Sequence, residues 1–190
     1  VGGFSVRCHW AGIIMIWTWP NTQLRAFIRM MILQNNRYDQ VTNTLGVIME
    51  WTKSGEDLLV RIDPGEEIHS SLQKLADEVG FNAAAITSGI GRTRENIYGY
   101  MNNDGVYIKR NLEPPSELVS LSGNIARTQD GTPFTHIHCC WTEDDNTVHA
   151  GHMFSCTVAV VAEIHLRVMP HAIMTRCPLA DVQLLGLQFS

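Results

Sequence analysis

The chain has 190 residues, of which 45% are hydrophobic and 17% are charged, and its formal net charge is −5. This length and composition are typical of a single globular domain and exclude a fibrous or disordered chain. The acidic total also excludes a positive field over the whole molecule that would attract nucleic acid or an anionic membrane.

The first 48 residues differ in composition and charge from the rest. Residues 1–50 carry four arginines and two acids (+2), whereas residues 51–190 carry 10 basic and 17 acidic residues (−7). The longest apolar run, Ala11–Trp19, is about half the ~20 residues that cross a bilayer, and the pattern over 24–33 predicts a short amphipathic helix. We expect 1–48 to be an extension of unclear role and 49–190 to be the domain proper.

The cysteines exclude two kinds of site. They are five in number, scattered and without a C-x-x-C spacing, which argues against a disulfide framework and against a cysteine-based zinc site. We interpret all five as reduced thiols of a cytoplasmic protein, with no membrane partner.

The first clear elements of the domain are a strand over 58–62 and a helix after it. Asp63 is a candidate N-cap, Pro64 would take the first helical position, and Gly80 is a candidate C-terminal stop. Apolar residues recur at helical spacing between 68 and 79.

The remainder alternates in the manner of strands. We predict them over residues 82–88, 96–101, 106–110, 118–126, 134–141, 147–154, 157–168 and 182–189. One main helix among eight or nine strands predicts an α+β fold, in which a mostly antiparallel, curled sheet packs with the helix.

Four of the eight histidines lie between positions 136 and 152. If the polar segment 143–147 turns a hairpin centred on Asp145, His138 faces His152, because their numbers add up to twice 145. Directly opposed residues on paired strands are neighbours, and His136 points to the same side as His138. The spacing therefore predicts that the three imidazoles converge.

Three converging histidines suit a metal ion. Zinc binds imidazole nitrogen and prefers four ligands, so His136, His138 and His152 would leave one position open for water or a small ligand. His149 would lie opposite Trp141 on the other face, so we exclude it as a ligand. The alternative is that H-x-H is a pair of exposed or hydrogen-bonded histidines, as short motifs often are.

Glu163 is a candidate for a supporting role. It lies on the polar side of the strand predicted over 157–168, where a carboxylate could orient a ligand or act as a general base. The alternative is an ordinary solvated or paired charge. The glycines of the segment 88–92 lack the residues that follow in a phosphate-binding loop, and a tight turn or a close backbone approach is the commoner reason for such glycines.

Six segments together resemble the "plants and prokaryotes conserved" (PPC) domain family, over about residues 57–189. They are RIDPGEE (61–67), AAAITSGIG (83–91), LVSLSGNIA (118–126), DGTPFTHIH (130–138), AGH (150–152) and VAVVAEI (158–164). The resemblance implies an antiparallel sheet packed with one helix, and a homotrimer. It also implies that His136, His138 and His152 bind a metal ion, with zinc as the first candidate. Ala150 stands where the family usually has a second glycine. The AT-hook core of plant members is absent from the chain, so it resembles the prokaryotic, metal-binding type.

Three functions follow as alternatives. The first is a trimeric metal-binding protein that acts on or binds a small molecule. If it is an enzyme, it would be a metal-dependent hydrolase or lyase with Glu163 as the base. The second is a DNA-associated regulator, which the acidic body makes doubtful as a direct DNA binder. The third is a structural metal in a protein-interaction scaffold.

Overall fold

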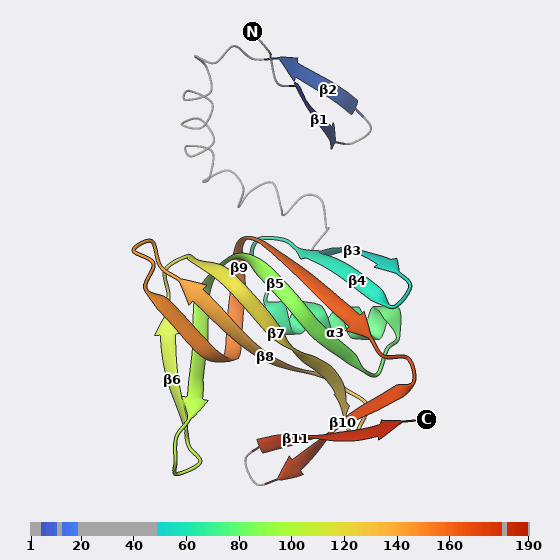
Figure 1. The fold of residues 1–190 in the computed structure, drawn as a ribbon, viewed down its shortest axis with the longest axis vertical. Coiled ribbons are helices and arrows are strands. Elements are labelled where there is room, and N and C mark those ends of the chain that lie inside the picture. The colour runs from blue at the N-terminus through green and yellow to red at the C-terminus, as the bar shows by residue number, and fades with distance from the viewer. Residues whose placement is uncertain (1–4, 11–12, 19–48, 180–181, 190) are drawn as a thin grey trace. The chain divides into compact units, whose positions relative to one another are not determined.

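The structure is a computed structural model that describes residues 5–10, 13–18, 49–179 and 182–189 (Figure 1). The chain divides into two compact units, Val1–Gly46 and Val47–Ser190. In the first unit, β1 (Ser5–Trp10) and β2 (Ile13–Thr18) pair as an antiparallel hairpin that the sequence analysis did not predict. The helix predicted over 24–33 lies outside the described residues.

The second unit has the predicted α+β composition, with nine strands in one sheet and a single helix among its described residues. Its elements are β3 (Met49–Ser54), β4 (Asp57–Ile62), α3 (Ile68–Val79), β5 (Ala84–Met101), β6 (Tyr107–Leu112), β7 (Ser116–Thr128), β8 (Pro133–Thr142), β9 (Val148–Val168), β10 (Ala172–Leu179) and β11 (Val182–Phe189). No helix in this described part has both the length and the apolar character to span a membrane.

The sheet curls until four of its strands close on one another. The strand order is β11-β10-β7-β5-β9-β4-β3, with β6 paired to β5 and β8 paired to both β7 and β9. Strands β5, β7, β8 and β9 thus form a ring of pairings, all antiparallel, whereas β10 joins β7 in parallel. The ring places the β8–β9 hairpin between two supporting strands.

The helix begins later than expected. Asp63 is not its N-cap: the cap is Glu67, whose side chain accepts a hydrogen bond from the backbone N–H of Ser70 at 2.8 Å. Gly65, at φ +89°, makes a turn before it, and a turn with a left-handed residue cannot be the first turn of a helix. The predicted end is confirmed, because Gly80 is a left-handed C-cap.

The helix covers one face of the sheet (Figure 1). Its buried side chains, such as Leu72 and Leu75, join a core that includes Ile137 and Trp141 of β8 and Ile164 of β9. Burial alternates along β8, so that its odd-numbered residues from 133 to 141 are buried. The even-numbered residues of β8 therefore point away from α3.

Two pairs of predicted strands are continuous in the structure. The strands predicted over 82–88 and 96–101 merge into β5, which begins at Ala84, and those predicted over 147–154 and 157–168 merge into β9, which begins at Val148. Register shifts in the pairing of β5 with β9 lie where a break was expected. Gly91 continues β5 because the two strands approach closely there: a Cβ at Gly91 would lie 2.2 Å from the Val161 carbonyl oxygen. The segment 88–92 is thus strand, not a phosphate loop, whereas β3 and β10 were not predicted.

Candidate metal centre

The hairpin of β8 and β9 has the predicted register. His138 pairs with His152 and Trp141 pairs with His149. The turn is closed by Asp145, whose carboxylate accepts a hydrogen bond from the backbone N–H of Thr147 at 2.8 Å. The hairpin centre inferred from the sequence is therefore confirmed.

The imidazoles of His136, His138 and His152 converge on the face of the sheet that points away from α3. Their ring centroids are 5.2 Å (136 to 138), 5.0 Å (136 to 152) and 5.3 Å (138 to 152) apart. One ligand atom from each lies within 4.8 Å of the others. We call these three residues the triad.

The ring nitrogens of the triad differ from those of three other histidines in having no partner that the structure describes. In the described part of the chain no hydrogen bond involves them, and Nδ1 of His152 is buried without any partner. A buried polar atom is normally satisfied, so an unpaired imidazole nitrogen in a cluster of three fits a ligand to a metal ion. The donor atoms of the triad therefore fit a metal ion.

Three other histidines behave differently. His69 places its two ring nitrogens 2.7 Å from Thr135 Oγ1 and 3.1 Å from the Met153 carbonyl oxygen. His149 uses both of its nitrogens, on Tyr98 and Glu143, and His165 does so on Thr87 and Asp57.

Each of those three imidazoles is held by the protein itself. His149, which the sequence analysis excluded as a ligand, contacts the Tyr98 hydroxyl at 2.7 Å and a Glu143 carboxylate oxygen at 2.6 Å. Its place opposite Trp141, away from the triad, agrees with that exclusion.

Burial and neighbouring cations keep two of the triad imidazoles neutral. Burial lowers the pKa of His152 to about 4, helped by the charges of the other two triad members, of His69 and, least, of Lys109. Burial first and the charge of Arg176 second lower the pKa of His136. At neutral pH these two rings therefore offer lone pairs rather than protons, which is the form that binds a metal.

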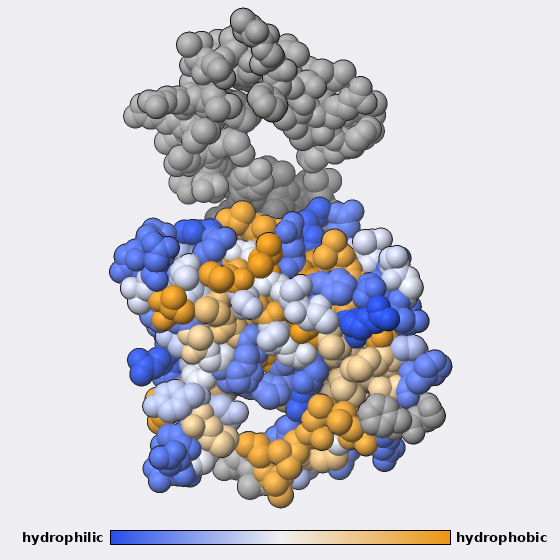
Figure 2. All heavy atoms as spheres, viewed as in Figure 1, coloured by the Kyte–Doolittle hydropathy of each residue, from blue (hydrophilic) through white to orange (hydrophobic). Residues whose placement is uncertain are grey.

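Aromatic rings line the side of the site at His152. The rings of Tyr107 and Phe154 have centroids 5.2 Å and 4.7 Å from the His152 ring, and Lys109 Nζ lies 4.3 Å from the Phe154 centroid. The space-filling view has an opening between β6 and the β10–β11 hairpin (Figure 2). The strands that border it carry Lys109 and Arg176.

Close strand packing holds the triad backbone in place. A Cβ at Gly123 would lie 2.0 Å from the His136 carbonyl oxygen, and a Cβ at Gly151 would lie 2.5 Å from the Gly99 carbonyl oxygen. Only glycine fits at such approaches. Ala150, the departure noted in the sequence, is an exposed residue of β9, so its methyl group does not crowd the hairpin.

Glu163 lies apart from the triad. It is eleven residues beyond His152 on β9, and its partners on the neighbouring strands are Arg61 and Ile90. It lines a shallow hollow over β3 and β4 together with Trp51. The reasoning from the sequence placed it on a face of the strand but could not place it along the strand.

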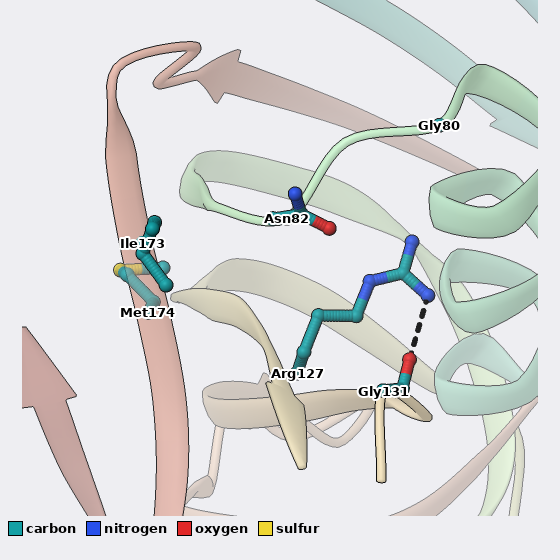
Figure 3. A pocket seen from close by; sticks show the side chains of 6 residues that line it. All are labelled: Gly80, Asn82, Arg127, Gly131, Ile173 and Met174. Atoms are coloured by element: carbon teal, nitrogen blue, oxygen red, sulfur yellow. Dashed lines mark hydrogen bonds between the residues drawn. The ribbon is translucent and has the colours of Figure 1, made fainter. Parts of the chain in front are cut away.

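A surface hollow beside Arg127, bordered by Asn82 and Met174, is built for structure. Figure 3 shows the Arg127 side chain directed at the Gly131 carbonyl, and the same guanidinium donates to the carbonyls of Ala76 and Phe81. It also pairs with Asp77. Because these contacts cap the end of α3, Arg127 has little capacity left for a ligand.

Cys139, Cys140, Cys156 and Cys177 are free thiols and take no part in the triad. Burial raises the pKa of Cys139 far above its usual range and that of Cys156 to about 12. Both are therefore protonated at neutral pH, the form that binds metal poorly.

Reasoning from the sequence missed three residues near the triad. His69, Lys109 and Arg176 come from α3, β6 and β10, far from 136–152 in the chain. No local motif links them to the histidines, so only the three-dimensional packing brings them to notice.

Comparison with known proteins gives a consistent result. The sequence model of the Plants and Prokaryotes Conserved (PCC) domain matches residues 49–170. No curated protein matches the chain.

Solved structures share its fold over nearly their whole length. A plant- and prokaryote-conserved (PPC) protein from Pyrococcus horikoshii is 27% identical, with a TM-score of 0.63 over 75% of this chain and 97% of that one. A metal-containing protein from Archaeoglobus fulgidus is 30% identical, with a TM-score of 0.61 over 74% and 98%. A protein from Bacteroides thetaiotaomicron, provisionally named as DNA-binding, is 23% identical, with a TM-score of 0.66 over 75% and 98%.

Proposed function

The chain belongs to the Plants and Prokaryotes Conserved (PCC) domain family, and we propose that it is a homotrimeric metal-binding member whose triad holds one divalent transition metal. Zinc is the first choice, because it accepts imidazole nitrogen and three protein ligands leave one of its four positions open. That position would take water or a small ligand. The relative from Archaeoglobus fulgidus, 30% identical and named as metal-containing, supports the proposal.

One observation carries the proposal: the triad nitrogens have no hydrogen-bond partner among the described residues, whereas His69, His149 and His165 use both of theirs. A structural histidine is held by hydrogen bonds, and a ligating one keeps a nitrogen free. The contrast within one chain therefore favours ligation over a merely exposed H-x-H pair.

The chemistry at the site follows from its surroundings. A metal ion bound to the triad would supply Lewis acidity to a ligand oxygen. The protein contributes neutral imidazoles, and the Tyr107 and Phe154 rings shield the His152 side from water. Glu163 has no part in this proposal, because its neighbours are Arg61 and Ile90.

A homotrimer is supported by the sheet face that α3 leaves uncovered. Leu59, Ile90, Val119 and Val160 are between 47% and 56% exposed. They lie on the mutually paired strands β4, β5, β7 and β9, and exposed apolar side chains gathered on one sheet mark association surfaces. Light scattering on the purified protein tests the trimer, and a monomer at micromolar concentration would contradict it.

A DNA-associated role is the weaker candidate. Residues 51–190 carry a net charge of −7, from 10 basic and 17 acidic residues, and DNA affinity comes mostly from Lys and Arg. The relative provisionally named as DNA-binding is 23% identical, a level at which only the fold carries over. A mobility shift with random duplex at low salt tests this role, and saturable binding would revive it.

Metal analysis tests the central proposal. Protein purified without chelators should contain about one metal ion per chain, and the His138→Ala variant should contain almost none. His149→Ala is the matched control: it removes an imidazole from the same hairpin that faces away from the triad, so it should keep its metal. An unmutated protein without stoichiometric metal would overturn the proposal.

A scaffold role for the metal predicts a different outcome. If chelation separates or unfolds the assembly and no substrate is turned over, the metal is structural.

A further inference from the structure

Arg176 of β10 is a buried cation with unused donors. Its residue is 3% exposed. Its Nη1 donates to the Gln183 carbonyl at 3.1 Å and its Nη2 donates to Asn124 Oδ1. Its Nε is buried and has no partner. A guanidinium has five N–H donors, so more than half of its hydrogen-bonding capacity is not used by the protein.

This guanidinium lies beside the triad. Asn124, which holds it, is the direct cross-strand partner of His136. Phe134, two residues before His136 on the same face of β8, lies below the guanidinium, whose central carbon is 5.1 Å from the ring centroid. The effect of the Arg176 charge on the pKa of His136 agrees with this proximity.

Within residues 49–179 and 182–189, no carboxylate forms an ion pair with Arg176. Among the described residues, every ion pair involves some other cation. A buried charge without a counter-charge is costly, and two neutral acceptors with one aromatic ring offset only part of that cost.

The other side of the triad is also positive. Lys109, next to Phe154, lowers the pKa of His152. Three imidazole ligands bring no negative charge, so a divalent cation on them would leave the whole site positive. What the site lacks is an anion.

We propose that Arg176 makes the triad a receptor for a small oxyanion, namely the carboxylate or phosphate group of an organic ligand. The inference rests on the metal-binding function proposed above and names its ligand class. Arginine presents planar, parallel donors that match both oxyanions, and desolvation strengthens such charge-assisted bonds. The unpaired Nε and the spare N–H groups of Arg176 would bind the anion, while the open metal position would accept one of its oxygens.

Calorimetric titration of the zinc-loaded protein with acetate and, separately, with inorganic phosphate tests the proposal. We expect saturable binding of at least one anion and a loss of affinity of about tenfold or more in Arg176→Gln. The control is Arg167→Gln, which removes the same charge from an exposed residue paired with Asp57 and should bind as the unmutated protein does. The preferred anion identifies the ligand as a carboxylate or a phosphate.

A second variant covers the case in which Arg176→Gln does not fold. Asn124→Asp keeps the shape of the side chain and gives Arg176 an internal carboxylate, so it should also weaken anion binding. Equal anion affinity in the unmutated protein and in the folded variants, with zinc bound to each, would overturn the inference. Absence of zinc from the unmutated protein, measured with a chromophoric chelator, would instead overturn the proposed function.

Discussion

Gly123 offers a quantitative test of how the triad is held. The residue lies on β7 beside β8, and a Cβ placed there would be 2.0 Å from the carbonyl oxygen of His136. Real Cβ atoms essentially never approach another atom closer than 3.0 Å, so in Gly123→Ala the strands must separate locally by about 1 Å, the difference of these two values. The obstacle is backbone, which cannot rotate away as a side chain can.

Two costs add up in this variant. Ladder hydrogen bonds beside Gly123 would stretch beyond useful length, at roughly 1 kcal/mol each, and overpacking costs typically about 1–3 kcal/mol. We therefore expect the free energy of unfolding to fall by about 2–4 kcal/mol. Because the backbone of His136 is what moves, zinc affinity should also fall, by about tenfold or more.

Urea denaturation and chelator competition measure the two effects. Gly186→Ala is the control: a Cβ there would meet Cys177 Sγ at 3.3 Å and the Thr175 carbonyl oxygen at 3.4 Å, so it should change stability by less than about 1 kcal/mol and leave zinc affinity unchanged. If Gly123→Ala matches this control in both measurements, the tight packing of β7 against β8 does not hold the triad.

Further predictions concern a hydrogen bond in the core, the stability at acid pH and the effect of zinc on stability. Thr93→Val leaves the buried indole N–H of Trp141, now 3.0 Å from Thr93 Oγ1, without an acceptor, so thermal unfolding should reveal a loss of about 1–3 kcal/mol. Burial lowers the pKa of His69; the folded state then binds its proton less readily than the unfolded state, so stability should fall as the pH drops below about 6.5. His69→Gln should weaken that fall, and an unchanged slope in urea titrations at several pH values would contradict it. Zinc at a hundred times its dissociation constant should stabilise the protein by about 2.7 kcal/mol and raise its melting temperature, whereas the melting temperature of His138→Ala should not respond.

The triad could be inferred from the sequence because its geometry is local. His138 and His152 belong to one hairpin with a short polar turn, and the period of two along a strand puts His136 beside them. The α+β class followed in the same way from one run of helical spacing among alternating segments. Local periodicity was sufficient to predict the structure wherever the contacting residues are close together in the sequence.

One of the missed features is local, and the other depends on a distant part of the chain. The predicted start of α3 was wrong because the turn at Gly65 competes with the capping signal of Asp63. The N-cap is Glu67 instead. Residues 82–88 and 96–101 were separated because glycine usually ends a strand, but Gly91 is needed for contact with Val161. The residue pattern of one segment does not show which distant segment will pack against it.

Charge illustrates the same limit on the scale of the site. The total of −7 over residues 51–190 argues against phosphate binding by the body as a whole. Yet the triad lies between Arg176 and Lys109, two cations that both act on its histidines, because β10 and β6 bring them in from opposite sides. Electrostatic interactions fall off within about 10 Å at ordinary salt, so a ligand in the site would experience these two cations rather than the total. An acidic protein can therefore have a site that selects anions, and the same local field would not extend far enough to hold a DNA duplex.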